Sequence, residues 1–147
     1  MSGPTAVVDT SIFVGAKNPE EPEHQDCERV LELAHQGRFH ALVSAVTVAE
    51  VCAGYYLEKD DPGRAVFLDY LSSAGVFEIV PLDTLLADRA ARVRSETSLK
   101  LPDAIILASG LERGASFVVT HDSAFAKASG LLTALSAREC LRKLERD

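Results

Sequence analysis

The chain has 147 residues, of which 47% are hydrophobic and 25% are charged. These fractions are typical of a soluble folded domain and exclude an extended disordered chain. The formal net charge of −7 excludes nucleic-acid binding through a broadly basic surface, but a cluster of carboxylates could still bind phosphate through cations, because bound metal ions reverse the local field. We therefore expect one folded domain over residues 1–147.

The N-terminal segment and the cysteines predict the cellular compartment of the protein. Residues 1–5 contain no basic stretch, and Asp9 interrupts the short apolar run that follows, so we expect no secretory signal. The longest apolar run, residues 41–49, is far shorter than a membrane span, so we expect no membrane partner. Cys27, Cys52 and Cys140 are odd in number and lie in apolar helical patterns, which predicts buried thiols in a reducing compartment. The protein is thus predicted to be cytoplasmic.

The first half of the chain is predicted to alternate strands with helices. An apolar run at residues 6–8 predicts a strand that ends at Asp9, where the sequence Asp-Thr-Ser favours the start of a helix. Four apolar residues then recur at helical spacing until Gly37 ends a helix of about four turns: Cys27, Val30, Leu31 and Ala34. Residues 39–43 predict a second strand, and Ser44 is expected to cap the helix that carries Glu50.

The next elements continue this alternation. A further helix is expected to begin at Asp61-Pro62 and to end at Gly75. Residues 76–82 predict a third strand, in which Glu78 interrupts the apolar run as an edge strand allows. Asp83 then caps a long helix with an inward apolar stripe formed by Leu82, Leu86, Ala90 and Val93.

The C-terminal third supplies a buried helix and two more strands. Pro102 opens a helix whose residues 104–111 are nearly all apolar, which predicts burial on several sides. Residues 117–119 predict a fourth strand that ends at Asp122, residues 131–135 predict a fifth, and Ser136 caps a final helix. Because strands alternate with helices throughout, the sheet is predicted to be parallel.

Four acidic residues are candidates for a functional site. Asp9 and Asp122 directly follow predicted strands, at the edge where open parallel sheets bind ligands, although each could simply cap a helix. Asp103 could be an acid in a first helical turn, where the helix dipole favours it. Glu50 is the one charge in an apolar segment, and a carboxylate there is costly unless it is paired, binds metal or reaches solvent.

Other phosphate-handling families fit this sequence poorly. A haloacid-dehalogenase-like phosphatase would carry a second Asp where Ser11 stands, and a receiver domain would need a phosphate-accepting Asp after the third strand, where Asp83 is a poor substitute. The sequence contains no glycine-rich phosphate loop, and its four histidines show no zinc-binding spacing.

Taken together, the four acids lie in an ordered set of motifs. The sequence reads VVDTSIF around Asp9, TVAEVCAG around Glu50, LPDAIILASG around Asp103 and VVTHDSAF around Asp122. This order resembles that of the PIN-domain nucleases from residue 7 to about residue 135, and the chain is similar in length to the VapC-type toxins of toxin–antitoxin pairs. The resemblance implies a Rossmann-like three-layer α/β/α sandwich around a central parallel sheet of about five strands.

The resemblance also implies roles for individual residues. It makes Asp9, Glu50, Asp103 and Asp122 the catalytic acids and the ligands of Mg²⁺ or Mn²⁺, which are hard cations that prefer oxygen donors. Ser11 and Thr120 are then expected to orient these ligands. One departure is visible, because His121 stands where the family often has Asn, and the resemblance gives it no role.

The activity implied is that of a divalent-metal-dependent endoribonuclease, the toxin of a type II toxin–antitoxin system, with RNA as substrate, a cognate antitoxin as partner and a homodimer as the assembly. An RNA-processing PIN nuclease outside such a pair and a catalytically silent PIN-like binding module remain alternatives. Arg89, Arg92 and Lys100 are candidates for binding RNA phosphates, unless Asp88 and Glu96 pair with the arginines on a solvated helix face. The aromatic residues of two adjacent helices could form core or a partner surface: Tyr55, Tyr56, Phe67 and Tyr70.

Overall fold

The computed structural model describes residues 3–73 and 75–145 of the chain. Five residues of the predicted domain lie outside this description: 1, 2, 74, 146 and 147. Residues 1 and 2 belong to the N-terminal segment in which no secretory signal is expected. In the described part, a five-stranded sheet has the order β3-β2-β1-β4-β5, and each neighbouring pair is parallel. The strands are β1 (Thr5–Val8), β2 (His40–Ser44), β3 (Phe77–Val80), β4 (Phe117–Val119) and β5 (Thr133–Leu135).

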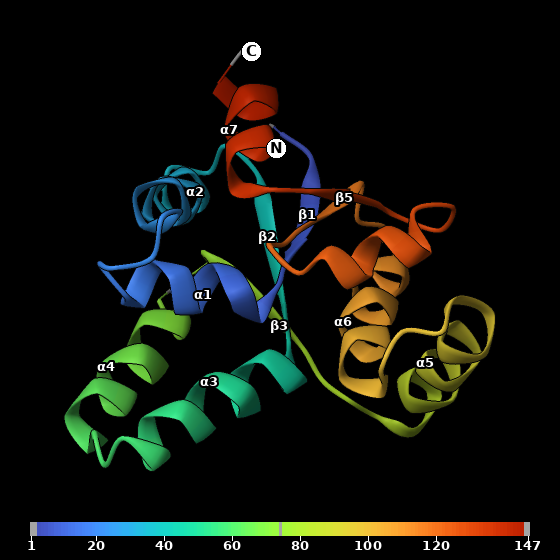
Figure 1. The fold of residues 1–147 in the computed structure, drawn as a ribbon, viewed down its shortest axis with the longest axis horizontal. Helices are drawn as coiled ribbons and strands as arrows, with labels where there is room; N and C mark the ends of the chain where they lie inside the picture. The colour runs from blue at the N-terminus through green and yellow to red at the C-terminus, as the bar shows by residue number, and fades with distance from the viewer. Residues whose placement is uncertain (1–2, 74, 146–147) are drawn as a thin grey trace.

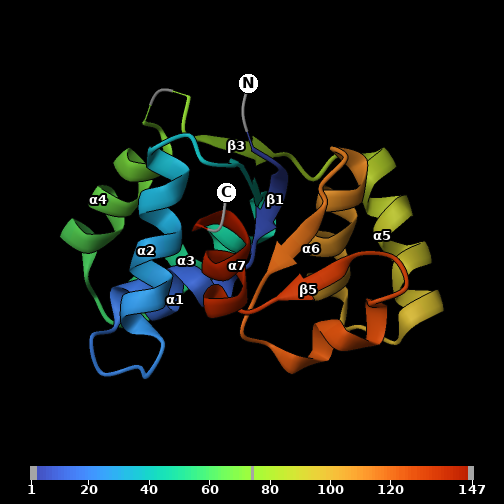
Figure 2. The same ribbon diagram turned by 90° about the horizontal axis from the view of Figure 1, so that it is seen from above.

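Helices cover both faces of this sheet, so the chain forms three layers (Figures 1 and 2). One face is covered mainly by α1 (Thr10–Lys17), α2 (His24–His35), α4 (Asp61–Leu71) and α7 (Ala137–Glu145), with α3 (Ala45–Leu57) beside them. The other face is covered by α5 (Thr84–Thr97) and α6 (Leu101–Glu112), and the 3-10 helix η1 (Ser123–Ala128) lies near them. The predicted Rossmann-like α/β/α sandwich is therefore confirmed.

The apolar runs of the central strands explain why both faces need cover. Successive side chains of a strand point to opposite faces. Accordingly, Ala6 and Val8 of β1 belong to one buried cluster, whereas Val7 between them belongs to the other. All three side chains are fully buried. A strand buried on both sides reads as a continuous apolar run rather than an alternating one, which is the pattern of residues 6–8.

Several helix starts follow the predicted capping chemistry. The Ser44 hydroxyl accepts a hydrogen bond from Val46 N at 3.1 Å, and Asp83 Oδ1 accepts one from Leu86 N at 2.9 Å. Ser136 and Glu139 form a reciprocal pair at the start of α7, because each side chain accepts from the other's backbone N–H. These bonds satisfy amide groups that the first turn of a helix leaves without partners.

Some predicted boundaries were wrong. The third strand ends at Val80 rather than Leu82, since Pro81 has no N–H to donate to a ladder. Leu82 therefore precedes α5 instead of joining its inward stripe, and its side chain is 43% exposed. The fifth strand is shorter than predicted, because the chain first turns after the unpredicted η1. Cys27 and Cys140 are buried as expected, but Cys52 is only half-buried.

No helix in residues 3–73 or 75–145 is both long and apolar enough to cross a membrane.

Candidate functional site

The sheet order places the ends of β1 and β4 side by side. Val8 is paired with Val119, and Asp9 N continues the ladder by donating to Val119 O at 3.0 Å. Successive connections run from β1 toward β3 on one side and toward β5 on the other, so this pair flanks the point where the winding reverses. Asp9 and Asp122 leave these two adjacent strands, as the sequence predicted.

Asp9 is held by a set of short hydrogen bonds to one carboxylate oxygen. Asp9 Oδ2 accepts from Ser11 Oγ at 2.7 Å, from Thr120 Oγ1 at 2.8 Å and from Ser11 N at 3.3 Å. The side chain is only 4% exposed, and no described residue donates a hydrogen bond to Oδ1. Asp9 therefore does cap α1, but this role occupies a single oxygen and leaves the other as a free acceptor.

The two hydroxyl groups also tie Asp9 to the segment after β4. Ser11 Oγ accepts from His121 N at 2.9 Å, and Thr120 Oγ1 accepts from Asp122 N at 2.9 Å. Each hydroxyl thus receives a backbone N–H of that segment and donates its own proton to Asp9. The predicted neighbours Ser11 and Thr120 lie in contact with Asp9, and they couple its position to that of Asp122.

Glu50 reaches the site from α3. Its side chain is exposed, so the apolar sequence around it does not bury the carboxylate, and the alternative that it reaches solvent is correct. Thr10 Oγ1 donates to Glu50 Oε1 at 2.7 Å and lies 3.0 Å from Thr47 Oγ1, which is fully buried one turn earlier on α3. Thr10 directly follows Asp9, so the hydrogen bond connects two of the candidate acids.

Asp103 lies in the first turn of α6, and its pKa depends on the charges around it. Its pKa is raised from 3.8 to about 6, mainly because partial burial disfavours the charged form. The negative charges of Asp122, Asp9 and Glu50 raise this pKa further, in that order, whereas the positive charge of Lys100 lowers it. All three other acids therefore lie within electrostatic range of Asp103.

The oxygen atoms of the four acids and their hydroxyl neighbours suit a hard divalent cation, although the acidic side chains are not arranged around one common position. Within the described residues, no three histidine, cysteine or acidic side chains are placed so that they could already hold a metal ion. The available donors are carboxylate and hydroxyl oxygens, which are the ligands of Mg²⁺ and Mn²⁺. Asp9 Oδ1 accepts no hydrogen bond from the described part of the chain, while Asp122 uses Oδ1 to cap η1. The chemistry of this donor set fits such an ion.

His121 links the site to two helices. Its Nε2 accepts a hydrogen bond from Ala137 N, 3.2 Å away at the start of α7, and its Nδ1 lies 3.8 Å from the buried Cys27 Sγ of α2. An acceptor at Nε2 implies that the neutral ring carries its proton on Nδ1. The residue where the family often has Asn thus anchors the segment that carries Asp122 to the helical layer.

The candidate phosphate-binding residues separate into two groups. Arg89 pairs with Glu112 of α6 rather than with Asp88, and Arg92 lies 3.9 Å from Glu96 with a side chain that is 80% exposed. Lys100 precedes α6 and is close enough to lower the pKa of Asp103. Of the three predicted cations, the structure thus places Lys100 beside the acids.

The aromatic residues of α3 and α4 mostly form core. The Phe67 ring packs against those of Phe13 and Tyr55, with centroid distances of 5.8 and 6.2 Å. Tyr70 packs against Phe77. Tyr56 differs, because 59% of it is exposed and Arg64 lies over its ring.

Sequence reasoning missed the contacts of Thr10, Thr47 and His121. The first two were detectable as hydroxyl residues inside apolar segments, with Thr47 three positions before Glu50 and therefore on the same helix face. The contacts of His121 with α2 and α7 join residues distant in sequence, and no local pattern reports them.

A parallel sheet with acidic side chains at its switch point defines a Rossmann-like α/β/α protein with an anionic site. Residues 6–131 match the sequence model of the PIN domain. Because this match covers most of the chain, the protein belongs to the PIN domain family. A search of curated proteins gives no significant match.

Solved structures of similar fold include several from toxin–antitoxin systems. A toxin–antitoxin complex from Klebsiella pneumoniae is 24% identical, with a TM-score of 0.68 over 90% of this chain and 97% of that chain. FitAcB from Neisseria gonorrhoeae is 21% identical, with a TM-score of 0.68 over 90% and 98% of the two chains. The sarcin–ricin loop cleaving toxin VapC20 of Mycobacterium tuberculosis is 17% identical, with a TM-score of 0.71 over 87% and 97%. At these identities the likeness shows a shared fold.

Proposed function

We propose that the chain, as one domain, is a divalent-metal-dependent endoribonuclease and the toxin of a type II toxin–antitoxin pair. One observation carries the proposal: Asp9 and Asp122 follow adjacent strands at the switch point of a PIN-domain sheet, within electrostatic range of Asp103, whose pKa is raised by burial and then by the charges of Asp122, Asp9 and Glu50. Carboxylates gathered in this way repel one another, and a bound cation offsets that repulsion. The solved structures of similar fold that are described as toxins or toxin–antitoxin complexes support the biological role.

The four acids would hold Mg²⁺ or Mn²⁺, with Asp9 and Asp103 as direct ligands and with Glu50 and Asp122 binding directly or through water. Such an ion activates water and offsets charge on the phosphoryl oxygens. The protein's own part is positioning. Hydrogen bonds from Ser11 and Thr120 fix one oxygen of Asp9 and leave the other directed away from this network.

The remaining acids are positioned by different means. Thr10 donates a hydrogen bond to Glu50 Oε1, which orients the Glu50 carboxylate although it is exposed. Asp103, with a pKa raised to about 6, retains a proton in part of the molecules near neutral pH. Because a carboxylate must lose its proton to bind a cation, metal binding at Asp103 is expected to release a proton.

The direct test is cleavage of a structured RNA by purified protein. We expect cleavage with Mn²⁺ or Mg²⁺, loss of cleavage with chelator and recovery when the metal is restored. The Asp9→Asn variant should lose cleavage and keep its circular dichroism spectrum, while Asp88→Asn, an exposed change on α5, should cleave normally. Full activity of Asp9→Asn would overturn the assignment. A folded wild-type protein that cleaves no RNA would favour a silent PIN-like binding module.

We also propose that an antitoxin segment binds in the groove between α1 and α3. This groove has a volume of about 530 Å³ and reaches Glu50 at the acidic site. Val14 and Leu57 line it with side chains that are 45% and 86% exposed, so a partner would gain by covering them. A segment seated there would also block access to Glu50.

This part of the proposal is tested by sequencing the region next to the gene and co-expressing any small protein encoded there with this chain. Co-expression should inhibit RNA cleavage, and Leu57→Asp should release the inhibition without changing the activity of the isolated chain. If no neighbouring protein binds and the chain still cleaves RNA, it is an RNA-processing nuclease outside a toxin–antitoxin pair. A homodimer would use other exposed apolar side chains, of which Leu85 on α5 is 81% exposed. Leu85→Glu should then produce a monomer in light scattering.

A further inference from the structure

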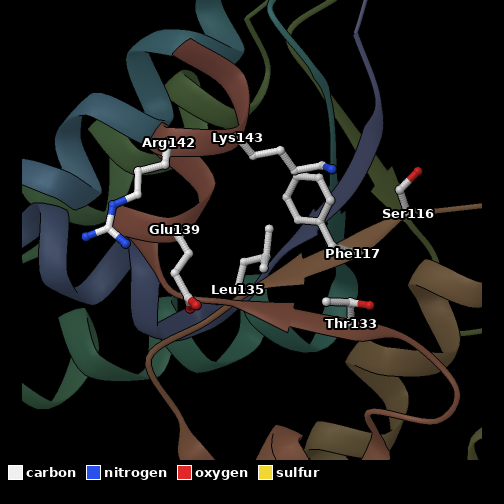
Figure 3. Close-up of a pocket in the computed structure, with 7 residues that line it drawn as sticks. All are labelled: Ser116, Phe117, Thr133, Leu135, Glu139, Arg142 and Lys143. Carbon is white, nitrogen blue, oxygen red and sulfur yellow. The ribbon is translucent and has the colours of Figure 1, made fainter. Parts of the chain in front are cut away.

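A second cavity lies between β4, the edge strand β5 and helix α7. It has a volume of about 520 Å³ and is distinct from the α1–α3 groove. Figure 3 shows Arg142 and Lys143 leaving α7 in different directions, with Lys143 over the Phe117 ring and the Arg142 guanidinium on the other side; Thr133 of β5 and Ser116, which directly precedes β4, lie across from α7. Two cations and two hydroxyl groups around an open hollow are donors suited to phosphate oxygens.

We infer that this cavity binds the phosphate backbone of the RNA substrate and forms, with the space beside Asp122, a track that leads to the acidic site. We call it the β5–α7 track. The inference rests on the proposed ribonuclease function and adds where the substrate lies.

The two cations of this cavity differ from most other cations of the described chain because no carboxylate pairs with them. Neither Arg142 nor Lys143 forms an ion pair with a described residue. Most arginines elsewhere are held by carboxylates, namely Arg29, Arg64, Arg89, Arg92, Arg113 and Arg138. In a chain with a net charge of −7, two cations without such partners along one cavity favour an extended anionic ligand that can contact each of them in turn.

The cavity adjoins a second hollow at the carboxyl end of β4. A smaller hollow of about 250 Å³ is lined by Thr120, His121 and Asp122 at the end of β4. Leu135 and Glu139 line both this hollow and the larger cavity, so the two share a boundary. A strand in the larger cavity would reach Asp122 by passing Leu135 and Glu139.

The separation suits a short stretch of nucleic acid. Helix α7 runs back from the carboxyl end of β5, and Arg142 is six residues beyond Ser136. At a rise of about 1.5 Å per residue, this places the Arg142 backbone about 9 Å from the catalytic edge. Because one strand of a duplex advances about 3.4 Å per nucleotide, the track spans about three stacked nucleotides.

The lining predicts how the strand would lie. Leu135 is apolar and can contact a base or a ribose. Glu139 is charged, because hydrogen bonds from the Ser136 backbone and side chain lower its pKa, and it repels a phosphate at this point. Phosphates are therefore expected at Arg142 and at Lys143 rather than at Glu139. Lys143 Nζ lies 5.8 Å from the centroid of the buried Phe117 ring, which supports the stem of this side chain.

The test compares two single-stranded RNAs with the full chain in chelator, where cleavage is blocked, using fluorescence anisotropy at several salt concentrations. A dinucleotide is shorter than the track and can contact only one of its cations, whereas an oligonucleotide of about twelve nucleotides can fill the track and extend to the acidic site. The double variant Arg142→Gln with Lys143→Gln should bind the longer RNA about tenfold more weakly at low salt. Its salt slope should decrease by about 1.4, because each single-strand phosphate contact contributes about 0.7.

Three controls separate this effect from a general loss of charge or fold. Lys59→Gln removes an exposed cation in the turn between α3 and α4 and should leave the affinity for both RNAs unchanged. Arg142→Lys with Lys143→Arg keeps both charges and should restore most of the affinity. Glu139→Gln keeps the acceptor that caps α7 and removes its charge, so it should bind the longer RNA more tightly.

The possible outcomes distinguish this inference from the proposed function. If the double variant behaves like Lys59→Gln while wild-type protein with Mn²⁺ cleaves RNA, the track is wrong and the ribonuclease assignment stands. If the wild type neither cleaves nor binds RNA, both are wrong. If inorganic phosphate or a nucleoside monophosphate binds the cavity and the longer RNA shows no dependence on Arg142 and Lys143, the cavity serves a small free anion, and the inferred RNA track is overturned.

Discussion

Replacing Asp103 with Asn should make the metal-free protein more stable at neutral pH. The folded chain raises the pKa of Asp103 from 3.8 to about 6, so between these values the folded state holds a proton that the unfolded state has lost. Stability therefore falls as pH rises through this window. Two pKa units correspond to about 3 kcal/mol, and because the side chain is still partly exposed, solvent screening reduces this to about 1–2 kcal/mol.

Urea unfolding in chelator at pH 4 and pH 7 measures this effect. Wild type should lose about 1–2 kcal/mol of its unfolding free energy relative to Asp103→Asn between the two pH values, and the variants should be nearly equal at pH 4. Asp88→Asn, exposed on α5, is the matched control and should keep the wild-type pH dependence. Identical pH dependence in wild type and Asp103→Asn would refute the reasoning that four carboxylates crowd one edge of the sheet.

Three further predictions follow from other contacts. Mg²⁺ at about 100 times its dissociation constant should stabilise the wild type by about 2.7 kcal/mol in thermal melts, and Asp9→Asn should lose this gain; an equal shift in both would place the ion elsewhere. Thr10→Val should lower the cleavage rate about tenfold by releasing Glu50, while Thr10→Ser keeps the hydroxyl and the rate. Gly15→Ala should destabilise the fold by about 1–3 kcal/mol, because the new Cβ would lie 2.6 Å from Cys27 Sγ. Cys27→Ala should relieve part of this cost, and strictly additive losses would contradict the contact.

The parts of the fold that local chemistry decides could be predicted from the sequence. The run at residues 6–8, the caps Ser44 and Asp83, and the apolar helix after Pro102 each depend on neighbours within a few positions, and all appear in the structure. Boundaries were less predictable where two signals compete. Leu82 continues an apolar pattern, but Pro81 ends the strand and Asp83 caps the helix, which leaves this side chain between elements.

The site was only partly predictable, because its members are distant in sequence. Asp9 and Asp122 could be placed at adjacent strand ends, since that position follows from parallel alternation and a plausible strand order. The apolar neighbours of Glu50 suggested an unusual burial, yet the side chain is exposed, because α3 buries only Thr47 and Val51. A charge in an apolar stretch of sequence is buried only if tertiary packing covers that face of the helix.

The hydrogen-bond network explains how the chain maintains like charges close together. Asp9 is the most buried of the candidate acids, and three hydrogen bonds fix one of its carboxylate oxygens. Asp103 has no comparable set of donors, and its pKa rises instead. The fold thus fixes one carboxylate firmly and leaves a partly protonated one opposite, which limits repulsion before a cation binds. Since Ser11 and Thr120 also accept hydrogen bonds from His121 N and Asp122 N, the same two hydroxyl groups position Asp9 and the backbone of Asp122 relative to one another.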